Sequence, residues 1–221
     1  MLELHQVHKS FEHNAFTLDV LRGIDLVLQR GESLAITGAS GAGKSTLLNI
    51  MGTLEPPTRG EVRFEDRNIL DLEEAELCRL RNRGMGFVFQ AHHLLPEFNA
   101  LENTMLPCLI QGISKKEALS RAEAILTLVG LKERLSHRPG EMSGGEQQRV
   151  AVARAMVLEP RVLLADEPTG NLDTRTGEAV FDLLQELNRD KGLTLIIVTH
   201  NMKLAGRLSR QIQMVDGRTV E

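Results

Sequence analysis

A glycine-rich stretch at residues 38–46 has the residue types and the spacing to bind a phosphate. It reads Gly-Ala-Ser-Gly-Ala-Gly-Lys-Ser-Thr, follows the apolar residues 33–37 and precedes the helical pattern of residues 47–51. Glycines let the backbone approach an anion closely, and successive N–H groups beside a helix N-terminus attract negative charge. Lys44 can reach the β- and γ-phosphates of a nucleotide, and the Ser45 hydroxyl can bind Mg²⁺. The complete G-x-x-x-x-G-K-S match in this context favours a nucleoside triphosphate site over a plain strand-to-helix turn.

Two carboxylates, Asp166 and Glu167, follow directly on the apolar residues 162–165. Ligands of parallel sheets bind at the carboxyl ends of the strands, where the glycine-rich stretch is also expected. Asp166 is therefore placed to hold Mg²⁺, directly or through water, and Glu167 to deprotonate a water aimed at the γ-phosphorus. An Asp-Glu pair at a strand end is often only a turn, but its combination with the glycine-rich stretch favours the catalytic interpretation.

Two further apolar runs end in polar side chains that could join the same site. Residues 195–198 lead to His200, which could hydrogen-bond the γ-phosphate and orient the attacking water. Residues 86–89 lead to Gln90, whose amide oxygen could reach the metal or that water. A structural histidine and a surface glutamine are the alternatives, and spacing alone does not overrule the surface interpretation of Gln90.

The sequence Ser-Gly-Gly-Glu at residues 143–146 predicts a second anion-binding helix terminus. Ser143 and Glu146 have the spacing of a capping box, and two glycines between them leave the backbone N–H groups free. As an isolated motif this is only a good helix cap. Because the stretch at residues 38–46 would already surround one phosphate, it is open which phosphate the terminus at residues 143–146 would bind.

Composition limits the class of protein. The 221 residues can bury one substantial core, and the net charge of −4 argues against a dedicated nucleic-acid binder, because phosphate backbones reward a basic surface. Cys78 and Cys108 show neither metal-site nor disulfide spacing, which favours two thiols in a reducing compartment. We find no run of roughly 18 apolar residues and no signal-peptide pattern, so we expect a cytoplasmic protein that serves a membrane only by docking onto other subunits.

The elements that must position these residues alternate between strands and helices. Residues 2–7 and 16–28 predict antiparallel β structure, with a turn at Arg22 and Gly23. Phe11 lies between these two stretches and either stacks on a purine or joins the core. Residues from 91 to about 141 predict one helix after another, including a capping box at residues 114–117. The remainder alternates apolar strands with helices, which implies a parallel sheet covered on both faces and a helical insertion.

Six motifs, in this order along the chain, resemble those of the ATP-binding subunits of ABC transporters. They are residues 38–45 (Walker A), 87–90 (Q-loop), 142–147 (signature), 162–167 (Walker B), 170–173 (D-loop) and His200 (H-loop). The resemblance spans nearly the whole chain. The signature begins with Met142 where leucine is usual and carries Glu146 where glutamine is frequent, and both changes keep the serine and the glycines. Phe11 matches the family's adenine-stacking aromatic, which is usually tyrosine.

The resemblance implies an α/β fold: a P-loop NTPase core with a mostly parallel sheet, an N-terminal antiparallel β subdomain and an inserted α-helical subdomain. One domain would span residues 1–221, with the core at 1–90 and 159–221 and the helical subdomain at about 91–158. It also implies an ATPase, which converts ATP and water to ADP and phosphate and couples this reaction to transport.

By the same resemblance, two copies join head to tail around two ATP molecules. Each site would combine one chain's Walker A loop with the partner's signature, and Asp173 would lie at the dimer interface. Glu167, His200 and Gln90 take the catalytic roles, and Ser45, Gln90 and Asp166 the Mg²⁺ ligands. The residues implied in ATP binding within one chain are Phe11, Gly38, Ala39, Ser40, Gly41, Ala42, Gly43, Lys44, Ser45 and Thr46. Those implied in trans are Ser143, Gly144, Gly145 and Glu146.

Residues 90–103 and 166–173 look most like the LolD/MacB/FtsE group of this family, and within it the lipoprotein-releasing branch. That resemblance implies a peripheral protein on the cytoplasmic face of the bacterial inner membrane, contacted near residues 91–107 by two LolC/LolE-like membrane subunits. It implies no nucleic acid and no direct lipid or cargo contact. The alternatives are a MacB-type macrolide or peptide exporter, an FtsE-like division complex and, less in keeping with the motifs, a soluble ABC ATPase outside transport.

Overall fold

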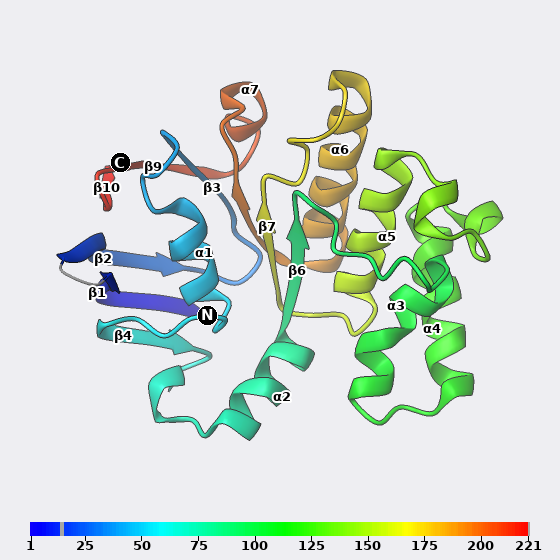
Figure 1. Cartoon of the computed structure of the whole chain (residues 1–221), viewed down its shortest axis with the longest axis horizontal. Helices are drawn as coiled ribbons and strands as arrows, with labels where there is room; N and C mark the ends of the chain where they lie inside the picture. Colours follow the sequence, from blue (N-terminus) through cyan, green and yellow to red (C-terminus); the bar gives the residue numbers. More distant parts are fainter. Residues whose placement is uncertain (14–15, 221) are drawn as a thin grey trace.

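A six-stranded sheet lies at the centre of the computed structural model, which describes residues 1–13 and 16–220 (Figure 1). Its strand order is β10-β9-β3-β8-β7-β6, and all neighbours are parallel except β10 and β9. The strands are β3 (Ser33–Gly38), β6 (Met85–Phe89), β7 (Val162–Asp166), β8 (Thr194–Val198), β9 (Arg210–Val215) and β10 (Arg218–Val220). The inner strands β3, β7 and β8 are apolar nearly throughout because helices or a second sheet cover both of their faces.

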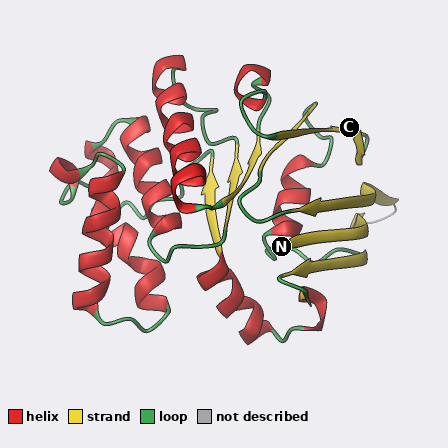
Figure 2. Cartoon of the chain, turned by 180° about the vertical axis from the view of Figure 1, so that it is seen from behind, coloured by secondary structure: helices red, strands yellow, loops and turns green. Residues whose placement is uncertain are grey.

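Successive residues of the strands supply the two sides of the core. Leu34, Ile36 and Leu164 pack with α1 (Lys44–Met51) and the N-terminal strands. Ala35, Leu163 and Ala165 pack on the opposite side. There they meet α5 (Gly144–Met156), α6 (Thr174–Lys191) and α7 (Met202–Ala205). Figure 2 shows the sheet between the helices on one side and the antiparallel strands on the other.

A second, antiparallel sheet has the order β2-β1-β4-β5. Its strands are β1 (Leu2–His13), β2 (Phe16–Leu28), β4 (Arg59–Phe64) and β5 (Arg67–Asn68). The turn predicted at Arg22 and Gly23 is wrong, because β2 continues through both residues. Val7 pairs with Ile24 and the next residue, His8, pairs with Arg22, so the register skips Gly23. Gly23, at φ 77°, therefore forms a β-bulge.

Helices follow β6 as predicted. They are α3 (Ala100–Ile110), α4 (Lys115–Leu128) and the short η2 (Lys132–Arg134) and η3 (Pro139–Glu141), and α3 and α4 pack on α5 beside the sheet (Figure 1). Ahead of β6 lie η1 (Ile69–Asp71) and α2 (Glu74–Gly84). Ser114 caps α4 by accepting from the Glu117 N–H at 3.3 Å. The predicted capping box is incomplete, because the Glu117 carboxylate instead accepts from Arg121 Nε at 2.8 Å.

The fold class predicted from the sequence is confirmed: a mostly parallel P-loop core, an antiparallel β part and a set of helices inserted between β6 and β7. The limits of the helical subdomain, about residues 91–158, stay a prediction. Within the described residues, no helix has both the length and the apolar character needed to cross a membrane.

Candidate active site at the strand ends

Four neighbouring strands end at one edge of the sheet, and each has a predicted site residue at or just beyond its end. Ile36, Val198, Asp166 and Phe89 are register partners across β3, β8, β7 and β6. The chain then continues from each strand to the glycine-rich loop, His200, Glu167 and Gln90 in that order across the sheet. The carboxyl ends of parallel strands are where α/β proteins bind ligands. The sheet therefore brings these predicted residues to one edge.

The glycine-rich loop joins β3 to α1 and depends on glycine at two positions. Gly38 has φ 137°, and a Cβ there would collide with the Met214 backbone carbonyl on β9. Gly43, the N-cap of α1, has φ 97°, and a Cβ there would lie 2.9 Å from Leu21 Cδ2 on β2. Only glycine fits both conformations without strain. The loop is thus held tightly against the sheets while its backbone opens at the positive end of α1.

Lys44 folds back over this loop. Its ammonium donates to the carbonyls of Gly38 at 2.9 Å and Ala39 at 2.8 Å. The lysine charge therefore lies over the loop that would surround a phosphate, while the adjacent Ser45 is exposed. A cation and a row of N–H groups at one point would attract a polyphosphate.

Glu167 and His200 are in direct contact. His200 Nδ1 lies 2.9 Å from Glu167 Oε1, and the Glu167 side chain is 17% exposed against 72% for His200. Glu167 has φ 45°, a left-handed conformation that costs a non-glycine residue about 1 kcal/mol or more. Its backbone N–H donates to the Val198 carbonyl at 2.9 Å, which holds this turn against β8. The strained turn presents the carboxylate to His200 instead of continuing the strand.

The residues proposed as metal ligands carry oxygen donors that suit Mg²⁺. These are the Ser45 hydroxyl, the Gln90 amide and the Asp166 carboxylate, from three different elements. The described residues contain no cluster of three or more His, Cys, Asp or Glu side chains that could hold a metal. One carboxylate with neutral oxygens and substrate phosphates is the usual protein site for Mg²⁺, so the donor set fits that ion. The assignment of these three ligands stays a prediction.

Gln90 is bound by Asn171, which the sequence analysis included in the D-loop without giving it a role. The Gln90 Nε2 donates to Asn171 Oδ1 at 2.9 Å, and Asn171 Nδ2 donates to the Gln90 carbonyl at 3.0 Å. No periodicity or motif spacing signals this contact, because 81 residues separate the two side chains. Only the parallel pairing of β6 and β7 brings them together.

The Ser-Gly-Gly-Glu stretch forms a complete capping box at the N-terminus of α5. Ser143 Oγ accepts from the Glu146 N–H at 3.3 Å, and Glu146 Oε2 accepts from the Ser143 N–H at 2.8 Å. Arg134 Nε also donates to Glu146 Oε1 at 2.8 Å. This ion pair, followed by the Ser143 backbone N–H, lowers the pKa of Glu146 to about 2. The sequence analysis missed Arg134, which lies 12 residues before its partner in a short helix with no distinctive pattern.

The capped terminus of α5 lies against the loop after β7. A Cβ at Gly144 would be 3.3 Å from Leu172 Cδ2, in the predicted D-loop. In the same loop, Asp173 accepts from the Thr176 N–H at 3.1 Å and caps α6. No hydrogen bond or ion pair joins residues 143–146 to residues 38–46 of the same chain, all of which lie in its described part. The two predicted anion-binding termini therefore have no direct polar contact with each other.

Phe11 stays a prediction as the adenine contact. It pairs with Leu18 in the β1–β2 ladder, and the nearby pair Lys9↔Leu21 brings that hairpin to Gly43 of the loop. The Phe11 side chain is 37% exposed, and Lys9 Nζ lies 4.9 Å from its ring centroid. The ring thus has one cation nearby and remains accessible to a flat ligand.

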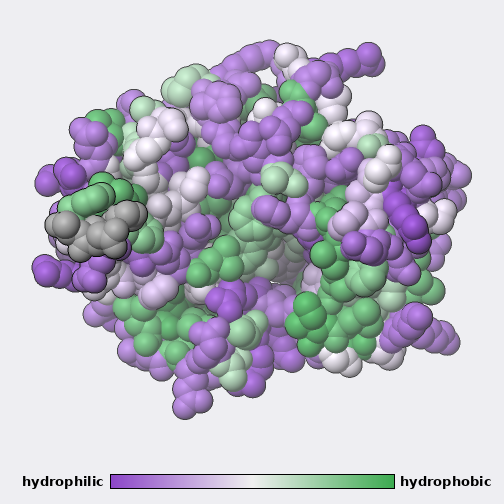
Figure 3. Space-filling model, viewed as in Figure 1, coloured by the Kyte–Doolittle hydropathy of each residue, from purple (hydrophilic) through white to green (hydrophobic). Residues whose placement is uncertain are grey.

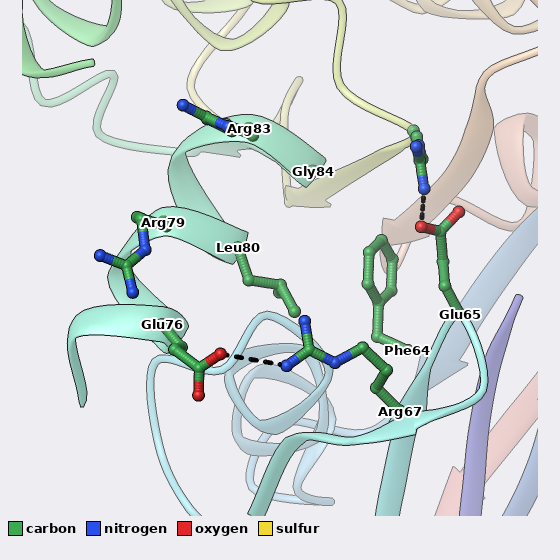
Figure 4. Close-up of a pocket in the computed structure, with 9 residues that line it drawn as sticks. Phe64, Glu65, Arg67, Glu76, Arg79, Leu80, Arg83 and Gly84 are labelled. Atoms are coloured by element: carbon green, nitrogen blue, oxygen red, sulfur yellow. Dashed lines mark hydrogen bonds and ion pairs between the residues drawn. The ribbon is translucent and has the colours of Figure 1, made fainter. Parts of the chain in front are cut away.

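A cavity of about 310 Å³ lies at the opposite ends of the central strands and contains none of the predicted site residues. Arg67 Nη2 lies 3.2 Å from Glu76 Oε1, and Arg161 pairs with Glu65 (Figure 4). Arg79, also labelled there, points away from Phe64. The arginines that line the cavity do not converge on one point. The strand ends are therefore the better candidate for the reactive site.

Comparisons with known proteins agree with this geometry. A family model described as ABC transporter matches residues 21–170. The lipoprotein-releasing system ATP-binding protein LolD of Syntrophus aciditrophicus is 56% identical over 220 residues, covering 100% of this chain and 99% of the relative. The LolD protein of Geobacter metallireducens is 54% identical over 220 residues, covering 100% and 98%.

Among solved structures, the chain is similar to the dimeric post-hydrolysis state of the ATP-binding cassette MJ0796 bound to ADP and Pi. The TM-score is 0.92 at 39% identity, over 100% of this chain and 97% of that chain. The fold, the order of the motifs and the family match over more than half of the sequence lead to one conclusion. This chain belongs to the ABC transporter family and is one of its ATP-binding, ATP-hydrolysing cassettes.

Proposed function

We propose that this chain powers the release of lipoproteins from the bacterial inner membrane, as one of two identical ATPase subunits that close around two Mg²⁺-ATP. One observation carries the ATPase part: Glu167 and His200 meet at 2.9 Å, level with the phosphate-binding loop. A carboxylate held beside the γ-phosphate is what the activation of water requires. The assignment of lipoproteins is supported by the relatives, which bear that name at 54–56% identity over their full length.

The strand-end geometry supports the following roles in the reaction. Lys44 and the loop N–H groups would bind the β- and γ-phosphates. Ser45, Gln90 and Asp166 would hold the metal ion, which would supply positive charge to the phosphates. Glu167 accepts a proton from the attacking water at its carboxylate. His200 donates from Nδ1 to Glu167 Oε1 and so orients that carboxylate.

The predicted contact of His200 with the γ-phosphate sets a condition on the imidazole. While Nδ1–H donates to Glu167, Nε2 can donate to a phosphate only if it is protonated too, which makes the ring an imidazolium. Otherwise the ring must leave Glu167 when it turns to the phosphate. His200 is the more exposed partner, at 72% against 17%, and has the freedom to make that turn.

The second anion-binding terminus explains the head-to-tail dimer. Residues 143–146 form a capped helix end with exposed Ser143 and Gly144, and in the part of the chain that the structure describes they make no hydrogen bond or ion pair to residues 38–46. We place them against the γ-phosphate in the partner's loop, where the positive end of α5 offsets the charge that develops in the reaction. The solved relative with ADP and Pi is described as a dimer, which supports this arrangement.

The membrane subunits dock in a groove between α2 and α3. It measures about 500 Å³ and is lined by Leu54, Phe87, Leu106, Ile110 and Leu158 among others. Ile110 is 76% exposed, and apolar side chains gather over this region in Figure 3. Exposed apolar patches of this kind mark interaction sites. We assign the groove to a cytoplasmic helix of LolC/LolE-like subunits, which places the chain at the cytoplasmic face of the inner membrane as a peripheral protein.

Reconstitution tests this function. The chain is co-expressed with candidate LolC/LolE-like subunits, purified as a complex and placed in proteoliposomes that carry a fluorescent lipoprotein. We expect ATP-dependent transfer of the lipoprotein to a periplasmic acceptor, and no transfer with Lys44→Ala. Hydrolysis without transfer, together with co-purification of an FtsX-like or MacB-type membrane partner, would contradict the lipoprotein assignment and leave the ATPase assignment intact.

A further inference from the structure

We propose that Asn171 is a positioning residue that fixes the amide of Gln90, so that its oxygen and not its nitrogen is available to the metal ion. The inference rests on the proposed role of Gln90 as a Mg²⁺ ligand. Asn171 belongs to the loop after β7, whereas Gln90 ends β6, and the two side chains meet because these strands are neighbours.

The backbone around Gln90 is held from α5. Gln148 Nε2 donates to the Phe89 carbonyl at 3.4 Å, and Arg154 donates to the carbonyls of His92 at 2.7 Å and His93 at 2.6 Å. Both histidines lie in the left-handed region, at φ 59° and 49°. A turn in such a conformation persists only when its surroundings hold it there. The backbone of Gln90 is therefore fixed, and its side chain is the part that remains to be oriented.

The orientation of the two amides follows from a chain of donors and acceptors. The Gln90 backbone carbonyl can only accept, so Asn171 must present its Nδ2 to it, at 3.0 Å. This turns Asn171 Oδ1 toward the Gln90 side chain, and an oxygen without a proton can only accept. Gln90 must then offer Nε2, which it does at 2.9 Å. Its Oε1 is directed away from Asn171 and makes no hydrogen bond to any residue in the described part of the chain.

Space for this arrangement comes from Gly170. A Cβ at that position would lie 2.9 Å from Gln90 Nε2 and 3.1 Å from its Cδ. A side chain at this position would crowd the glutamine amide, which would have to shift. Gly170 and Asn171 together therefore form a seat for Gln90: the first leaves room for the side chain, and the second determines which end of the amide faces the seat.

The seat also connects the metal ligand to the dimer contact. The next residue, Leu172, packs against Gly144 of the capped α5 terminus, and Asp173 caps α6. A displacement of this loop on dimer closure would move Asn171 and hence the Gln90 oxygen. Outer-shell partners of metal ligands usually influence metal affinity by 10- to 100-fold, roughly.

Mn²⁺ binding measured by electron paramagnetic resonance tests the proposal without relying on turnover. In a Glu167→Gln background with saturating ATP, we expect Asn171→Ala to weaken Mn²⁺ affinity by about 10-fold. Affinity for ATP in EDTA should be unchanged. Asn171→Asp, which keeps the acceptor but places a carboxylate oxygen against the Gln90 carbonyl, should not restore the affinity. Asn188→Ala, which removes an amide that donates to the Gly31 and Leu193 carbonyls at the opposite ends of β3 and β8, is the matched control and should have no effect.

A double-mutant cycle separates this inference from the proposed function. In a Gln90→Ala background, Asn171→Ala should cause no further loss of Mn²⁺ affinity, because the amide that it orients is gone. Equal losses in both backgrounds, or an unchanged affinity in Asn171→Ala alone, would overturn the positioning role. If Gln90→Ala itself leaves Mn²⁺ affinity unchanged, the metal-ligand assignment in the proposed function fails instead.

Discussion

At the scale of single residues, the proposed chemistry depends on a few side chains at the strand ends. The carboxylate of Glu167 is held by a strained backbone and by one bond to His200. That bond leaves the second carboxylate oxygen of Glu167 available to a water molecule. The cation of Lys44 lies over the adjacent loop. Removal of the proton acceptor should therefore stop hydrolysis while leaving the phosphate-binding groups in place.

Glu167→Gln provides the residue-scale prediction. The amide keeps the size of the side chain but cannot take the proton of water, so hydrolysis should fall by at least about 100-fold. ATP binding measured by isothermal titration should change little. Because ATP then persists, the dimer should accumulate, and gel filtration with ATP should show it. A variant that hydrolyses ATP at the wild-type rate would remove Glu167 as the base.

At the scale of elements, helix termini and helix faces decide how the site is built and joined to partners. The capping box at the start of α5 is complete, and Arg134 adds an ion pair to it. The face of α3 that carries Ile110 borders the apolar groove. Each feature predicts a measurable property of its own element.

Glu146→Gln tests the capping network through pH. Folding lowers the pKa of Glu146 from 4.5 to about 2, so the carboxylate contributes stability that is fully present above pH 4.5 and is lost as the pH falls toward 2. In wild type, part of the free energy of unfolding should therefore disappear between pH 5.5 and pH 3. The glutamine variant should lose less over this interval. Glu133→Gln, at an exposed position without an ion pair in the described part of the chain, is the control and should behave like wild type.

Ile110→Asp tests the docking groove. A charge on this 76% exposed apolar side chain should abolish co-purification with the membrane subunits, because it would have to be desolvated in the interface. ATP hydrolysis by the isolated chain should stay at the wild-type rate. Leu119→Asp is the matched control, because Leu119 is also an exposed apolar residue but lies on α4 and outside the groove. Unchanged co-purification of the Ile110 variant would assign the groove to some other role.

Patterns local in sequence predict most of these elements, and both local competition, as between Ser114 and Arg121 for Glu117, and contacts distant in sequence account for the errors. The alternation of apolar strands and helices and the box at residues 143–146 were sufficient, because period and capping are properties of neighbouring residues. The sequence alone does not distinguish a turn from a bulge at Gly23, because a glycine with positive φ suits both. The bond between Gln90 and Asn171 could not be foreseen, since only the order of strands in the sheet brings them together.

At the scale of the whole molecule, we propose that two halves of one nucleotide site lie in separate parts of the chain. Within residues 1–13 and 16–220, no hydrogen bond or ion pair joins the loop at residues 38–46 to the α5 terminus at 143–146. Each half should therefore find its complement in a second copy, and ATP should hold the two together. Hydrolysis and loss of phosphate then remove that link, which converts chemistry into opening and closing of the dimer beneath the membrane subunits.

Cysteine crosslinking between two copies tests this central claim most directly. Ser40→Cys is introduced into one batch and Ser143→Cys into another, both with Glu167→Gln and with the exposed Cys78 changed to serine. When the batches are mixed, we predict a disulfide-linked dimer that forms with Mg²⁺-ATP and not with ADP. A mixture that gives no ATP-dependent crosslink, although each variant binds ATP, would contradict the shared site.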